Sequence, residues 1–258
     1  MVQTMKNKIK AENTMKKTKE TTKTTNIAPI LPPTLFKDVS QVSLRSYALI
    51  FSEGTGKKVS PINSLVGHSG NLKIPSHTAI FNMSSANDCP SKKLGLCKAA
   101  KAGVKCYALK AEYEYHPDVL PYRRRQEAYW KSVTANQFVA DFLLMNACKV
   151  KPFKSIRFNE AGDFHSQKCI DKAERIAMLL SRFGIVCYCY TSRSDLKFTK
   201  CKYLIISGSG FKRKGISNQF RIVKDLKDRP KGFGVCKGNC RICDRCLIRG
   251  RKTVVMAH

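Results

Sequence analysis

Three apolar segments in the second half of the chain alternate with segments of helical pattern, and this alternation constrains the fold most. Residues 154–159, 185–190 and 203–207 are predicted strands, while residues 166–182 and a short segment around 195–198 are predicted helices. Strands that alternate with helices form right-handed crossovers and a parallel sheet. We therefore predict an α/β fold, in which a parallel sheet of βα repeats curls into a partial or full TIM-like barrel.

Polar residues follow the predicted strands at the points where they end. The first strand ends at Asn159, with Glu160 and Asp163 just after it, and the second ends at Tyr190, with Ser192 just after it. Functional groups gather at the carboxyl ends of parallel strands. We predict that Glu160 and Asp163 act as catalytic acid–base groups and that Asn159, Tyr190 and Ser192 line the substrate pocket. The alternative for Asp163 is a helix-capping role.

Four cysteines lie within eleven residues near the end of the chain: Cys236, Cys240, Cys243 and Cys246. Spacings this short do not suit relaxed disulfides, but they allow several thiolates to converge on one metal centre. The run is closer to ferredoxin-type spacing than to a two-armed zinc knuckle. It therefore favours an iron–sulfur cluster of the 4Fe-4S kind, with zinc as the alternative.

Three earlier cysteines, Cys89, Cys97 and Cys106, are also predicted metal ligands, because charged residues flank them rather than apolar ones. They would hold a second cluster, or join the terminal cysteines at one site if the ends of the barrel meet. Core positions are predicted for the remaining cysteines: Cys148, Cys169, Cys187, Cys189 and Cys201.

The chain carries 48 Lys and Arg against 18 Asp and Glu, a formal net charge of +30. This excess favours a nucleic-acid partner through phosphate neutralisation and counterion release; the alternative is a background of lysine-rich sequence. Part of the charge lies in residues 1–38, a predicted disordered basic leader. Residues 39–258 are predicted to form a single α/β domain that ends in the cysteine cluster.

One long helix is predicted over residues 118–149, and its first turns interleave aromatic residues with arginines. That combination can stack on bases and grip phosphates, so Arg123 and Arg124 are predicted to bind substrate. The alternative is a buried aromatic face opposite a solvated basic face. The sequence leaves both open.

The first thirty residues lack the apolar core of a secretory signal, and no apolar run is long enough to cross a bilayer. We therefore expect a cytoplasmic protein with reduced cysteines and no membrane partner. The sequence does not indicate protein partners.

With these motifs, the chain resembles the gene-product-88 family of phage and plasmid proteins over roughly residues 64–250. The resemblance rests on Cys89-Pro90, Cys97, Cys106-Tyr107-Ala108, the strand and turn of residues 157–164, Tyr190-Thr191-Ser192 and the closing cysteines. It implies an architecture more than a reaction.

More distantly, the layout is similar to radical-SAM-like partial barrels, in which an early cysteine loop precedes βα repeats. In those enzymes Cys-x3-Cys-x2-Cys follows the first strand, whereas here that spacing occurs at Cys236, Cys240 and Cys243. This spacing can leave one iron open to a cofactor, so S-adenosylmethionine is a candidate cofactor.

Two hypotheses follow. The first is an iron–sulfur enzyme, with radical chemistry as one form of it, acting on nucleic acid or a nucleotide in a phage or plasmid setting. The second is a non-catalytic nucleic-acid-binding protein with structural zinc, in which the polar strand ends are only caps and turn formers.

Overall fold

The computed structural model describes residues 62, 65–66, 71–101, 103–115, 117–147 and 149–256. The predicted basic leader, the first part of the predicted domain and Cys148 lie outside these residues. No helix in the described part of the chain is long and apolar enough to cross a membrane.

Seven strands form one sheet, and each neighbouring pair of strands is parallel. The strands are β1 (Thr78–Phe81), β2 (Ser155–Phe158), β3 (Val186–Thr191), β4 (Ile205–Ser209), β5 (Asn218–Val223), β6 (Gly234–Val235) and β7 (Lys252–Met256). Their order in the sheet is β1-β2-β3-β4-β5-β7-β6. The predicted α/β fold with a parallel sheet is confirmed. The first five strands are adjacent in chain order, and closure into a partial or full barrel stays a prediction.

The helices before residue 116 are short, and the three later helices are longer and pack beside the sheet. They are α3 (Pro90–Lys93), α4 (Lys98–Lys101), α5 (Tyr107–Lys110), the π-helical turn η3 (Ala111–Tyr115), α6 (Val119–Ser132), α7 (Ala135–Ala147) and α8 (Gln167–Ser181). Three 3-10 turns follow: η4 (Leu226–Asp228), η5 (Cys240–Ile242) and η6 (Arg245–Leu247).

Two predictions about helices were wrong. The single helix predicted over residues 118–149 is two helices, α6 and α7, because Val133 takes an extended conformation with ψ of 154°. The Thr134 hydroxyl then accepts a hydrogen bond from the Gln137 amide at 3.1 Å and starts the next helix. The segment around 195–198 is a turn rather than a helix, and there the Asp195 side chain accepts hydrogen bonds from the Arg193 guanidinium.

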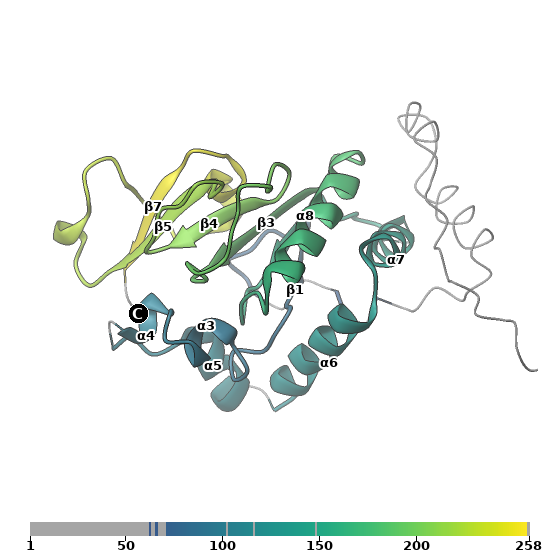
Figure 1. The fold of residues 1–258 in the computed structure, drawn as a ribbon, viewed down its shortest axis with the longest axis horizontal. Helices are drawn as coiled ribbons and strands as arrows, with labels where there is room; N and C mark the ends of the chain where they lie inside the picture. Colours follow the sequence, from purple (N-terminus) through teal and green to yellow (C-terminus); the bar gives the residue numbers. More distant parts are fainter. Residues whose placement is uncertain are drawn as a thin grey trace, which may run out of the picture. The chain divides into compact units, whose positions relative to one another are not determined.

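One face of the sheet is apolar and packs against helices. The rings of Phe81 on β1 and Phe138 on α7 meet edge to face at 5.0 Å, and Trp130 on α6 lies 6.1 Å from Phe158 on β2. Helix α8 contacts β3, as Figure 1 shows. The core positions predicted for the described cysteines are confirmed, since all four are buried: Cys169, Cys187, Cys189 and Cys201.

The opposite face of the same sheet, called the polar face below, carries polar and aromatic side chains together with Ile80 and Ile205. The register pairs Arg157 with Tyr188, and Tyr190 with Ser207, so these four side chains lie on one face. The last 3-10 turn, η6, contacts β3 and β4. Helices thus cover the apolar face of the sheet, and a cysteine-bearing segment covers the polar face.

Candidate metal centre

The segment that carries the four terminal cysteines is tied to the sheet by backbone hydrogen bonds. Cys236 follows β6, and its amide donates to the Val254 carbonyl at 2.7 Å. The Cys240 amide donates to the Lys73 carbonyl, which precedes β1, at 2.8 Å. Within the segment, the Asn239 side chain caps η5. These bonds bring the end of the chain to the start of the first strand.

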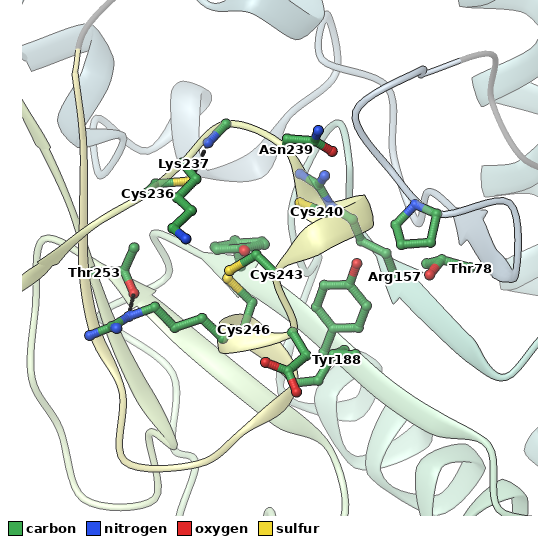
Figure 2. A pocket seen from close by; sticks show the side chains of 16 residues that line it. Thr78, Arg157, Tyr188, Cys236, Lys237, Asn239, Cys240, Cys243, Cys246 and Thr253 are labelled. Atoms are coloured by element: carbon green, nitrogen blue, oxygen red, sulfur yellow. Dashed lines mark hydrogen bonds between the residues drawn. The ribbon is translucent and has the colours of Figure 1, made fainter.

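All four of these cysteines line one cavity of about 40 Å³. Figure 2 shows them around it, with Arg157 of β2 and Tyr188 of β3 among the lining residues. The four thiols are partly buried. A single water needs roughly 10–15 Å³, so the cavity has room for an ion or a small inorganic group.

The electrostatics of the cavity act on the thiols in opposite directions. Burial raises the pKa of both Cys240 and Cys246. The Arg157 charge lowers the pKa of Cys240, and a hydrogen bond with Tyr190 lowers that of Cys246. The net shift favours the protonated thiol at Cys240 and Cys246 before a metal binds, so metal binding there must release protons.

The donor set fits a thiolate-bound centre, although the thiols are not yet gathered at one point. Among the residues that the structure describes, no three Cys, His, Asp or Glu side chains form a ready metal site. The four terminal thiols share one cavity, lie partly screened from water and have a cation beside them. Those are the surroundings that thiolate-ligated zinc and iron–sulfur centres use.

Arg157 is a site residue that the sequence interpretation missed. Its guanidinium carbon lies 5.2 Å from the centre of the Tyr190 ring, and its Nη2 donates to the Tyr107 hydroxyl at 3.4 Å. Its Nε is buried and has no hydrogen-bond partner among the described residues. The available signal was a charged residue in the middle of a strand that is otherwise largely apolar.

The earlier cysteines lie elsewhere, on the loop and short helices that follow β1. Cys89 and Cys106 immediately precede α3 and α5, and Cys97 immediately precedes α4. Burial, followed by the Asp163 charge, raises the pKa of Cys89 to about 12, and Cys97 adds a smaller contribution. None of the three lines the cavity of the terminal cysteines. The two sets thus do not share this cavity, and metal binding by the earlier one stays a prediction.

Asp163, a predicted catalytic residue, is buried at the carboxyl ends of the strands, with 3% of its surface exposed. Its carboxylate accepts hydrogen bonds from the hydroxyls of Ser91 and Thr191 and from the amides of Phe164 and Ser192, all at 2.6–2.8 Å. It therefore joins α3, beside Cys89, to the ends of β2 and β3. Helix α8 begins after Ser166, so Asp163 is not its cap.

Glu160 and Arg123 lie together in the interior. Arg123 Nη1 is 2.9 Å from Glu112 Oε1, and Arg123 Nη2 is 3.9 Å from Glu160 Oε2. All three residues are buried, and Asn71 also donates to Glu160 at 2.8 Å. For Arg123 this geometry favours the buried alternative that the sequence left open. Any catalytic role of Glu160 stays a prediction.

The remaining predicted site residues are placed differently. Arg124 is about half exposed, pairs with Asp88 at 3.2 Å and lines an open cleft of about 670 Å³. Asn159 is buried in a left-handed conformation with φ of 56°, and its Oδ1 accepts from the Met83 amide. Ser192 is part-buried beside Asp163.

Residues 49–209 match the family described as gene product 88. The chain belongs to the gene product 88 family. The matched region includes β1 to β4, the early cysteines and the Asp163 hydrogen bonds, and it ends before the terminal cysteines. No curated protein and no solved structure matches the chain.

Proposed function

We propose that this protein is an iron–sulfur protein whose terminal cysteines, Cys236, Cys240, Cys243 and Cys246, hold a 4Fe-4S cluster. The observation that carries the proposal is their common position around one partly buried cavity on the polar face of the sheet. Bound there, the cluster would supply one-electron chemistry. The chain's own contribution is to hold the thiols in place and to screen them from water.

The proposal extends to an enzyme that acts on nucleic acid or a nucleotide in a phage or plasmid setting. The net charge of +30 supports a polyanionic substrate. The polar residues predicted for its pocket lie near the carboxyl ends of β2 and β3, where parallel sheets collect their functional groups: Asn159, Glu160, Asp163, Tyr190 and Ser192.

A radical form of this enzyme would use S-adenosylmethionine. Two features support it: the Cys-x3-Cys-x2-Cys spacing of Cys236, Cys240 and Cys243, and the position of the early cysteine loop directly after β1. The layout, with an early cysteine loop before βα repeats, is similar to that of radical-SAM-like partial barrels, but the early cysteines here lack the Cys-x3-Cys-x2-Cys spacing. Cys89, Cys97 and Cys106 would then hold a second centre.

The second candidate is a non-catalytic nucleic-acid-binding protein with structural zinc. The small volume of the cavity, about 40 Å³, favours a single ion. The 3-10 turns that carry Cys240 and Cys246, together with the hydrogen bond of 3.4 Å from the Gly238 amide to the Cys236 sulfur, suit a compact thiolate site.

Anaerobic purification with an absorption spectrum and analysis of iron, sulfide and zinc tests the first candidate against the second. We expect a brown protein with about four iron and four sulfide per cluster. Cys243→Ala should lose the iron, whereas Cys187→Ala, on the apolar face of the sheet, should keep it. A colourless protein with stoichiometric zinc contradicts the cluster, and full iron retention in Cys243→Ala contradicts the ligand assignment.

Binding to labelled single- and double-stranded DNA and RNA tests the substrate class. The logarithm of the binding constant should fall linearly with the logarithm of salt concentration. Arg124→Gln should weaken binding if this exposed guanidinium meets phosphate, whereas the exposed helix residue Arg175→Gln is the charge-matched control. Absence of binding at low salt would exclude nucleic acid as the substrate.

A further inference from the structure

We propose that Arg157 provides the counter-charge for the thiolate centre and so controls its affinity for metal and its reduction potential. The inference rests on the proposed function, because it assigns a role to a residue of the same cavity. It concerns a positioning residue beneath the cysteines, not a ligand.

Arg157 lies on β2 of the sheet, whereas the terminal cysteines lie in the segment that follows β6, and both line the cavity. Its guanidinium lies between Tyr190, 5.2 Å away on β3, and the Tyr107 hydroxyl, 3.4 Å away beside Cys106. It lines the same cavity as the four cysteines, as Figure 2 shows. The cation is therefore close enough to act on the thiolates.

Arg157 is half-buried, and its partners differ from those of the two buried arginines, Arg123 and Arg193. Arg123 pairs with Glu112 at 2.9 Å, and Arg193 pairs with Asp195 at 2.8 Å. Within the described ranges Arg157 has no carboxylate within ion-pair distance, and the Glu160 charge acts on it only from further away. Its Nε is buried without a hydrogen-bond partner there. A screened cation is costly unless an anion compensates it.

A thiolate centre supplies that anion. Four thiolates bound to a dipositive ion or cluster core keep a net charge of about −2. Arg245 and Lys237 also line the cavity, but the Arg245 guanidinium already donates to Thr253 Oγ1 and the Lys252 carbonyl, and Lys237 is exposed. Arg157 is thus the cation placed to compensate the charge of the centre from the sheet side.

The test compares Arg157→Met and Arg157→Gln, both without the charge, with Arg157→Lys, which keeps it. Arg175→Met on the exposed face of α8 is the control for loss of one positive charge. The full chain is reconstituted anaerobically with iron and sulfide. Iron retention against a chelator and the reduction potential are then measured, and urea unfolding of the metal-free proteins checks that each variant folds.

We expect about 10–100-fold weaker iron retention and a lower reduction potential in the two neutral variants, because a positive charge favours the more negative, reduced cluster. Arg157→Lys should recover most of both, and Arg175→Met should change neither. Wild-type retention and potential in the neutral variants would overturn the inference while leaving the cluster in place. Equal losses in Arg157→Lys would also overturn it.

The outcome for the wild-type chain separates this inference from the proposed function. Wild-type protein that holds zinc instead of iron contradicts the cluster, and the same variants are then compared by zinc affinity, with the same 10–100-fold loss expected. Unchanged zinc affinity would overturn the counter-charge. Wild-type protein that binds neither metal through these thiols overturns both proposals.

Discussion

Replacement of Asp163 by Asn should weaken the junction between the early cysteine loop and the ends of β2 and β3. Each carboxylate oxygen accepts one hydroxyl and one backbone amide: Ser91 and Ser192 bond to Oδ2, and Thr191 and Phe164 bond to Oδ1. Asn turns one of these oxygens into an NH2 donor. The facing hydroxyl can rotate and accept, but the facing backbone N–H cannot.

The expected magnitude follows from that one lost acceptor. A buried N–H without a partner costs about 1–3 kcal/mol, so Asp163→Asn should lower the free energy of unfolding by about 2 kcal/mol. Asp163→Ala removes the acceptor from both backbone amides and should cost roughly twice as much. Thr191→Val removes one hydroxyl bond to Asp163 and also the acceptor of the buried Arg193 amide, so it should cost about 2 kcal/mol. Burial raises the pKa of the Asp163 carboxyl, and its hydrogen bonds oppose that shift.

Urea unfolding followed by circular dichroism measures these differences on the metal-free chain. Asp171→Asn, at an exposed position of α8, is the matched control and should stay within about 0.5 kcal/mol of wild type. Wild-type stability of Asp163→Asn would refute the account of Asp163 as a buried junction. It would then favour a carboxylate held for chemistry rather than for structure.

Three further predictions concern other buried or paired groups. Gly162→Ala should cost about 3 kcal/mol or more, because φ is +70° and the new Cβ would lie 2.3 Å from the Ser84 carbonyl oxygen; an unchanged thermal midpoint would contradict this. Arg123→Met should cost about 3–5 kcal/mol in urea unfolding, since it leaves buried carboxylates without their cation, and near-wild-type stability would restore a surface role. Hydrogen bonds from Arg193 hold the pKa of Asp195 below its usual value, so the ionised form stabilises the fold above about pH 4 and that stabilisation is lost as the pH falls. Because Asp195 is partly exposed, Asp195→Asn should cost under about 1 kcal/mol at pH 7 and nothing near pH 2, and an equal cost at both would refute the pairing.

Local sequence pattern was sufficient for the core of the sheet. The core positions predicted for Cys187 and Cys189 are confirmed, and the register places both on the apolar face while Tyr188 and Tyr190 lie on the other. A period of two fixes the face of every residue in a strand. The same reasoning did not detect the break at Val133, because an apolar pattern at helical spacing continues through both helices.

Pattern also did not decide the roles of the charged residues. Arg123 and Arg124 are neighbours in one basic run, yet one is buried in ion pairs and the other faces solvent. Arg157 lies in a strand whose sequence gives no reason to expect a cavity above it. Each outcome depends on which distant segment packs against the side chain, and spacing along the chain carries no information on that.

For the terminal cysteines, too, the sequence determined one part of the result and the tertiary structure another. Their short spacing alone made them candidates for one metal centre, because four cysteines within eleven residues do not suit relaxed disulfides but can bind one metal together. The tertiary structure decided where that centre would lie and what would surround it. The Cys240 amide donates a hydrogen bond to the Lys73 carbonyl, and Arg157 and Tyr188 line the cavity beside the cysteines. The surroundings of the thiols therefore come from segments that are far away in the sequence. The charge and screening of a site belong to its packing partners, and only the fold determines which partners those are.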